Sequence, residues 1–207
     1  MVTTDACLIV RAPHWTPARD IERFVEQKQN WITQKQEFFR KRPFQPKKQF
    51  INGEEFSFLG QVYPLCVAAD LPKAVVLADG ALMIAQVAVA NAADHVRHWY
   101  EKQALEYISQ RVEYYSRLTN LSYKSVKVSN ARTRWGSCSH AGGLNFNWRL
   151  IMASVRVIDY VVAHELMHLR QMNHSRRFWA EVAAVVPDYK QEERWLKQNG
   201  HLLHWKD

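Results

Sequence analysis

The chain is constrained most by the pentapeptide HELMH at residues 164–168, which His174 follows six residues later. Residues four apart lie one above the other on one face of an α-helix, so His164 and His168 can direct two imidazole nitrogens at one point. Glu165 is rotated off that face but can reach a water on a bound ion. The pattern therefore predicts two metal ligands and a carboxylate base, with a third ligand supplied from elsewhere.

The residues around this motif favour a metal site over a pair of structural histidines. The preceding run, residues 157–163, is apolar enough to form a buried helix. Burying two His and a Glu on such a helix without partners would cost several kcal/mol. Ser154 can cap the start of the helix and Asn173 can end it. The chain would then turn and bring His174 back beside the first two histidines.

Length and composition indicate a folded protein of one large domain or two small ones. The chain has 207 residues, of which 47% are apolar, and this excludes extensive disorder. The most apolar stretch, residues 81–93, is shorter than a membrane span, and the first residues lack a secretory signal pattern. The three cysteines have no metal-like spacing, so we expect a protein without disulfides in a reducing cytoplasm.

The net charge of +8 favours encounters with polyanions such as nucleic acid or nucleotides, although many basic proteins bind no polyanion specifically. One group of arginines flanks the histidine motif in the sequence, namely Arg132, Arg134, Arg149, Arg170, Arg176 and Arg177. Of these, Arg132 and Arg134 would point to the same side of a strand, where they could hold a carboxylate or phosphate or simply be solvated.

Residues 1–90 predict a small α/β region without a catalytic cluster. Residues 18–41 read as one amphipathic helix whose aromatic stripe we expect to be core. Asn52-Gly53 and Asp79-Gly80 are hairpin signals. The strands predicted in this region cover residues 7–12, 48–51, 54–59, 62–68, 75–77 and 82–84. We expect them to form a mainly antiparallel sheet beside the helix.

Residues 91–207 predict the catalytic domain of an α+β protein. A long helix should run from about residue 91 to Leu118, with a polar face of alternating charges that includes Arg111. A strand at 126–128 and a hairpin over 132–147 would follow, forming a sheet under the metal helix. An exposed strand edge there could bind an extended peptide. Gly136 would allow a close approach of the backbone, or would mark a bulge.

Two further helices should complete this domain, and one rival site lies before them. Ser175 can cap the first helix, and Pro187 suits the start of the second. Cys138 and His140 suggest a thiol nucleophile with its base. Nothing in the sequence supplies a third group to orient that pair, and a buried free Cys usually only packs.

The chain resembles the YgjP-like family of predicted metal-dependent hydrolases, also called DUF45. The motifs that carry the resemblance are RWGSCS at 134–139, YVVAHELMH at 160–168, NHS at 173–175 with Phe178-Trp179, and Pro187-Asp188. The resemblance covers nearly the whole chain and implies a zincin-like catalytic half after an N-terminal α/β extension. It also implies that His164, His168 and His174 bind the metal and that Glu165 is the catalytic base. The N-terminus departs from the family pattern, in which a longer strand region is usual.

Related zinc-protease patterns leave an alternative for the third ligand. The spacing H-E-x-x-H-x5-H matches metzincins, but Gln171 stands where they have Gly, and no Met-turn is visible downstream. Gluzincins take a Glu from the following helix, for which Glu181 is the candidate. We favour His174.

The sequence therefore predicts a zinc-dependent hydrolase, most simply a metallopeptidase in which Glu165 activates water. A nucleotide or phosphoanhydride hydrolase is the first alternative, with magnesium or manganese as a further choice of metal and arginines on the phosphates. A DNA-associated protease or binding module, by analogy with SprT-like zincins, is the second. The candidate substrate-binding residues are Arg132, Arg134, Trp135 and Arg177. The sequence does not predict the oligomeric state.

Overall fold

The computed structural model describes residue 2 and residues 6–40, 47–131 and 133–204. The chain divides into two compact units, Met1–Pro46 and Lys47–Asp207. The expected boundary between residues 1–90 and 91–207 falls inside the second unit, where helices of the later part contact strands of the earlier part. The expected boundary near residue 90 stays a prediction.

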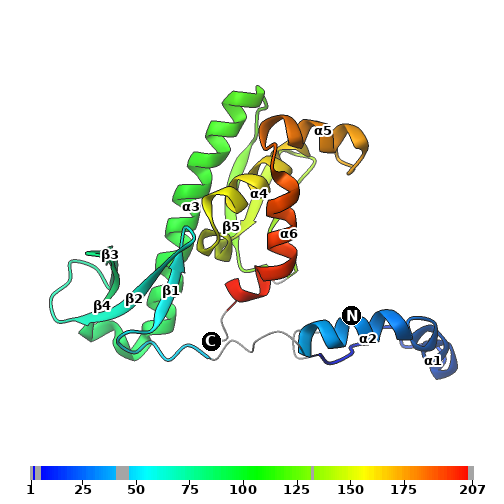
Figure 1. Cartoon of the computed structure of the whole chain (residues 1–207), viewed down its shortest axis with the longest axis horizontal. Coiled ribbons are helices and arrows are strands. Elements are labelled where there is room, and N and C mark those ends of the chain that lie inside the picture. Colours follow the sequence, from blue (N-terminus) through cyan, green and yellow to red (C-terminus); the bar gives the residue numbers. More distant parts are fainter. Residues whose placement is uncertain (1, 3–5, 41–46, 132, 205–207) are drawn as a thin grey trace. The chain divides into compact units, whose positions relative to one another are not determined.

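The first unit contains two consecutive helices, α1 (Ala18–Gln27) and α2 (Gln29–Arg40), drawn in blue in Figure 1. The single helix predicted over residues 18–41 is wrong, because Lys28 leaves helical geometry with φ −102° and ψ 6°. The strand predicted at residues 7–12 is also wrong, since this segment makes only an isolated bridge between Val2 and Leu8. The expectation that the stripe is core is wrong for α1, where no residue is buried, and for Trp31, which is 48% exposed, whereas Ile32 of α2 is buried.

The second unit begins with a four-stranded sheet in the order β1-β2-β4-β3. Its strands are β1 (Glu55–Phe58), β2 (Gln61–Ala68), β3 (Val75–Ala78) and β4 (Ala81–Ala85). The Asp79-Gly80 hairpin is confirmed, with φ of 50° and 75° at its two residues, as a two-residue turn between right-twisted strands requires. The sheet is mainly antiparallel as predicted, but its central pair, β2 with β4, is parallel.

The hairpin predicted at Asn52-Gly53 is wrong. Residues 48–51 form no strand, because the Glu54 carboxylate accepts the backbone N–H groups of Gln49 and Phe50. The turn that joins β1 to β2 is Leu59-Gly60 instead, again with both φ positive at 50° and 78°. The Glu54 side chain thus accepts the backbone hydrogen bonds that the strand expected at residues 48–51 would otherwise make with a neighbouring strand.

A 28-residue helix, α3 (Ala92–Thr119), follows a short 3₁₀ turn and contacts both sheets of the second unit. Its buried face repeats at three and four residues through Val96, Tyr100, Ile108 and Val112, as predicted. Tyr100 donates a hydrogen bond to the carbonyl of Ser57 in β1 at 2.7 Å. This helix therefore ties the first sheet to the part of the unit that carries the histidine motif (Figure 1).

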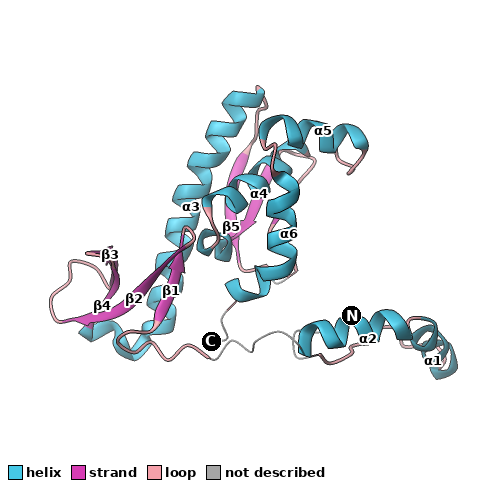
Figure 2. Ribbon diagram, viewed as in Figure 1, coloured by secondary structure: helices cyan, strands magenta, loops and turns pink. Residues whose placement is uncertain are grey.

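The remaining strands and helices include α4, which carries the histidine motif and contacts α3, α5, α6 and β6 (Figure 2). A three-stranded sheet has the order β5-β7-β6. These elements are β5 (Ser125–Ser129), β6 (Gly136–Cys138), β7 (Gly143–Asn147), α4 (Val155–Met167), α5 (Arg176–Val185) and α6 (Tyr189–Asn199). The predicted α+β class is confirmed. Within the described residues, no helix combines the length and the apolarity that crossing a membrane requires.

Candidate metal centre

The motif helix α4 begins as the sequence predicts and ends earlier. The Ser154 hydroxyl accepts the N–H of Val157, so Ser154 is the N-cap. The helix stops at Met167, with His168 as its C-cap, and the expected end at Asn173 is wrong. The N–H groups of Leu169 and Arg170 bond to carbonyls three residues back, which tightens the last turn.

An ion pair fastens α4 to α3. Arg111 of α3 donates through Nε and Nη2 to the two carboxylate oxygens of Asp159 at 2.5 Å and 2.9 Å. Both side chains are largely shielded from solvent, and a two-bond contact fixes direction as well as distance. The alternating charges of α3 predicted that Arg111 is solvated. That prediction is wrong for Arg111, because it is paired with Asp159. It fixes the helix that carries the histidines.

Three imidazoles meet at the C-terminal end of α4. One ring nitrogen each of His164, His168 and His174 lies within 4.8 Å of the other two, and the Nε2 atoms of His164 and His174 are 3.0 Å apart. His164 and His168 are half-buried, whereas His174 is exposed. Two neutral ring nitrogens at this distance must share one proton or direct both lone pairs at one cation. The arrangement therefore fits a metal with nitrogen ligands.

Hydrogen bonding and burial prepare two of these rings for a cation. The Nδ1 of His168 lies 3.0 Å from the carbonyl of Gln171, which makes Nδ1 the donor and leaves the Nε2 lone pair for a ligand bond. Burial, with His168 and His174 nearby, lowers the pKa of His164 to about 3. Burial also lowers the pKa of His168. Both rings are thus neutral near pH 7, as metal ligation requires.

The aromatic side chains of α5 form a wall against the three histidines. Phe178 is fully buried, and its ring centroid lies 4.7 to 4.9 Å from those of His164, His168 and His174. Trp179 stacks on His174 at 5.7 Å. The sequence suggested these two residues only as packing and motif positions. The cap Ser175, directly after His174, was the signal that α5 starts at the site.

Glu165 lies on the β6 side of α4. Glu165 is only 7% exposed, and its carboxylate lies beside Gly136. Burial raises the pKa of Glu165 to about 7 in the metal-free protein, while the nearby Arg134 guanidinium opposes the shift. A carboxylate that is shielded from solvent and belongs to the residue directly after His164 is a suitable candidate for a general base.

A family model described as YgjP-like, metallopeptidase domain, matches residues 1–199. The chain belongs to this family. The family suspected from the sequence is therefore confirmed, and the chain is a metal-dependent hydrolase of the metallopeptidase type. Membership of a metallopeptidase family implies a divalent metal and suggests peptide or protein substrates.

Two solved structures are similar to part of this YgjP-like chain. The zymogen of the metallopeptidase abylysin from Pyrococcus abyssi is 20% identical, with a TM-score of 0.41 over 44% of this chain and 93% of its own. The zymogen of jannalysin from Methanocaldococcus jannaschii is also 20% identical, with a TM-score of 0.40 over 46% and 96%. No curated protein sequence matches the chain.

Strand β6 is an edge strand whose outer side faces away from β7. The N–H of Asn147 bonds to the carbonyl of Trp135, and the N–H of Ser139 bonds to the carbonyl of Gly143. Because bonding alternates along an antiparallel pair, the N–H and C=O groups of Gly136 and Cys138 point away from β7. Among the residues that the structure describes, the outward N–H and C=O groups of Gly136 and Cys138 pair with no other strand, and Gly136 lies beside Glu165.

The candidate substrate-binding residues are distributed differently from the prediction. Arg132 lies outside the described residues. Arg134 is exposed just before β6. Trp135 packs its indole against Gly200 and lies 5.3 Å from the ring of His204, so it contacts the C-terminal segment. These positions leave Arg134 as the described arginine with an electrostatic effect on Glu165.

Three other arginines of the predicted group contact groups away from the histidines, and a fourth, Arg176, is exposed at the start of α5. Arg170 and Arg177 each approach one oxygen of Glu181, at 3.5 Å and 3.4 Å. Glu181 is not in the histidine group, and its carboxylate faces these two cations. Arg149 is buried, donates to Asn130 and lies over the ring of the adjacent Trp148.

Cys138 and His140 do not form the rival catalytic pair. Strand β6 ends at Cys138, and His140 lies exposed in the turn that follows. Burial and the carboxylate of Glu165 raise the pKa of the Cys138 thiol, which disfavours the thiolate that a nucleophile needs.

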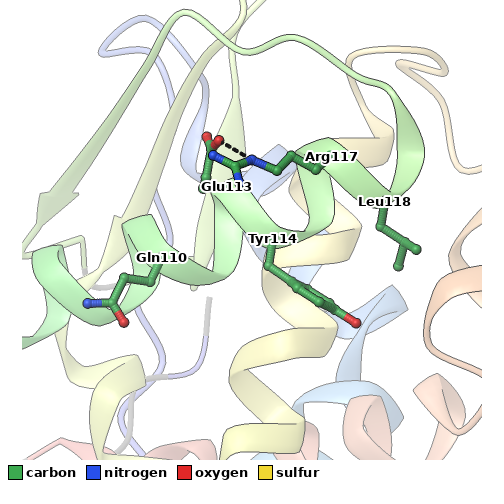
Figure 3. Close-up of a pocket in the computed structure, with 5 residues that line it drawn as sticks. All are labelled: Gln110, Glu113, Tyr114, Arg117 and Leu118. Atoms are coloured by element: carbon green, nitrogen blue, oxygen red, sulfur yellow. Dashed lines mark hydrogen bonds and ion pairs between the residues drawn. The ribbon is translucent and has the colours of Figure 1, made fainter.

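A separate hollow lies along α3 and is lined by five of its residues, Gln110, Glu113, Tyr114, Arg117 and Leu118 (Figure 3). Glu113 and Arg117, one helical turn apart, pair at 2.7 Å, and Tyr114 and Leu118 are more than half exposed. None of the candidate site residues lines it.

Proposed function

We propose that this chain is a zinc-dependent metallopeptidase in which His164, His168 and His174 hold the ion and Glu165 is the general base. The observation that carries the proposal is the group of three imidazole nitrogens within 4.8 Å, with the buried Glu165 carboxylate on the adjoining residue. Three imidazole ligands suit zinc, and such a ligand set leaves one position for water or substrate. When bound, zinc lowers the pKa of water to about 7 and polarises the scissile carbonyl.

The side chains of this site move one proton. Glu165 accepts a proton from the attacking water and delivers it to the leaving nitrogen of the peptide. Glu165 is only 7% exposed, so water screens its carboxylate little, and this strengthens the electrostatic contacts of that carboxylate. The hydrogen bond from His168 to the Gln171 carbonyl keeps that ring in the ligating tautomer.

An extended peptide is the proposed substrate. The outward N–H and C=O groups of Gly136 and Cys138 can pair with such a peptide as an added strand. Arg134, before this strand, is placed to attract an acidic group of the substrate. The phosphoanhydride alternative would use Arg132, Arg134, Arg176 or Arg177 on the phosphates, and it is less favoured because Arg177 already pairs with Glu181. A cytoplasmic location stays an expectation from the cysteines.

The first test is cleavage of a diverse peptide library by zinc-loaded protein, followed by mass spectrometry. Glu165→Gln should lose turnover by at least about 10³-fold while it keeps the ion, since the amide cannot accept the proton. Cleavage that survives in Glu165→Gln would contradict the role of the base. If the unmutated protein cleaves nothing with zinc confirmed bound, the peptidase proposal fails and nucleotides become the next substrates.

The third ligand is tested by metal retention in two variants. His174→Ala should weaken zinc binding, measured by competition with a chromophoric chelator. Glu181→Ala should not, because its carboxylate binds Arg170 and Arg177. The reverse result would assign the third ligand to Glu181.

A further inference from the structure

The identity of residue 136 is set by a side chain and not by the backbone. The φ angle of Gly136 is not positive, and the residue pairs regularly with Phe146 in the β6–β7 ladder. Neither a left-handed conformation nor a bulge therefore requires glycine here. A Cβ at this position would lie 2.5 Å from Cγ, 2.6 Å from Oε1 and 2.8 Å from Cδ of Glu165. These separations are far inside carbon–carbon contact distance, about 3.5 Å or more.

Glu165 has little freedom to accommodate such an atom. It sits in the last turn of α4, where helical side chains are restricted to two χ1 rotamers. Its neighbours on the helix, Ala163, Leu166 and Met167, are buried. The Arg111–Asp159 pair and the Ser154 cap hold the helix itself. A methyl group on residue 136 would therefore displace the carboxylate and leave α4 in place.

We propose that Gly136 is a positioning residue for the general base. Without a side chain, it lets the Glu165 carboxylate lie directly against the backbone of β6. The inference rests on the proposed function, since it assigns a structural cause to the location of the base. It also links two parts of the site, because the outward N–H and C=O of the same residue are those that would pair with a peptide. One residue thus sets the distance between the base and the substrate backbone.

Gly136→Ala tests the proposal in the zinc-loaded protein. The kcat on a library-derived peptide should fall about 10²-fold, the loss typical of a reacting group misplaced by about 1 Å. KM should stay within about threefold, and zinc affinity should be unchanged, because the substitution touches no histidine. The matched control is Gly143→Ala in the neighbouring strand, where the new Cβ would meet only the Ser139 and Ser125 hydroxyls. An unchanged kcat in Gly136→Ala would overturn the proposal.

A second readout does not depend on activity. Gly136→Ala should lower the Tm, and the loss should shrink when it is made in the Glu165→Ala background, because that change removes the three crowded atoms. An equal loss in both backgrounds would mean that Glu165 is not the reason for the glycine, and the proposal would be wrong. If the unmutated protein cleaves no peptide, the peptidase proposal fails, while this cycle still decides the contact between Gly136 and Glu165.

Discussion

Helices α1 and α4 differ in what they bury, although the sequence predicts a helix at both places. Nine of the 13 residues of α4 are buried, whereas none of the 10 residues of α1 is. The two sequences differ in the matching way. The apolar residues of α1 form one stripe, whereas in α4 seven of the first nine residues are apolar.

The comparison shows which sequence signal carries burial. An amphipathic stripe predicts that a helix can cover a core, but it does not supply the core. A helix that is apolar on all sides needs partners on all sides, and α4 has them in α3, α5, α6 and β6. Polar groups placed on such a helix are then held firmly enough for chemistry. Four measurements of the unfolding free energy test this difference between α4 and α1.

Metal binding at the end of α4 should give the largest effect. Zinc at about 1,000 times its Kd should raise the free energy of unfolding by about 4 kcal/mol, because only the folded chain brings the three histidines together. Urea unfolding with zinc and with chelator measures the difference. His164→Ala should abolish it, and His98→Ala, on exposed α3 surface, should preserve it. Equal zinc stabilisation in His164→Ala would break the assignment.

Protonation of Glu165 should give the next largest effect in the metal-free protein. Its pKa rises from 4.5 to about 7 on folding, so the folded chain holds the proton more tightly, and stability from this group falls as the pH rises through that window. Glu165→Gln should therefore match the unmutated protein near pH 4 and be more stable by about 3 kcal/mol at pH 8.

The control for this pH dependence is Glu113→Gln. Its hydrogen bonds from Arg117 and Tyr123 lower the pKa of Glu113, so the carboxylate stabilises the folded chain above its ordinary pKa. This variant should lose stability at neutral pH, the opposite sign from Glu165→Gln. A pH-independent difference for Glu165→Gln would show that its carboxylate is solvated.

Loss of the α3–α4 ion pair should cost less. Asp159→Ala leaves a partly shielded Arg111 without its carboxylate, and we expect a loss of about 1–3 kcal/mol in urea unfolding. The matched control is Asp94→Ala, which breaks an exposed pair with Arg97 and should cost about 0.5 kcal/mol or less. Equal losses would mean that the pair does not fasten α4.

The apolar stripe of α1 should give the smallest effect. Phe24 is 56% exposed, so Phe24→Ala should change the unfolding free energy by no more than about 0.5 kcal/mol. Ile158→Ala, a fully buried position of α4, should cost about 2–5 kcal/mol. A loss of similar size at Phe24 would show that something covers α1 in solution, and the contrast between the helices would disappear.

Local signals account for what the sequence predicted correctly. The Ser154 and Ser175 caps, the Asp79-Gly80 turn and the approach of the three histidines each depend on residues a few positions apart. Other outcomes depend on distant residues. The Asn52-Gly53 turn is drawn into another arrangement when the Asn52 side chain accepts the N–H of Val67. The two explanations of Gly136 could not be separated either, because Glu165 reaches it from a different element.

The early end of α4 gives the metal a second role. His168 lies at the helix end, and His174 arrives through a short segment in which Met172 and Asn173 are exposed. An ion bound by both imidazoles would join the two ends of this segment and close it into a loop. The loop could then open only if the ion were lost. We therefore expect trypsin to cut after Arg170 more slowly in zinc-loaded protein than in chelated protein. Resistance to proteolysis would then report occupancy of the centre before any substrate is known.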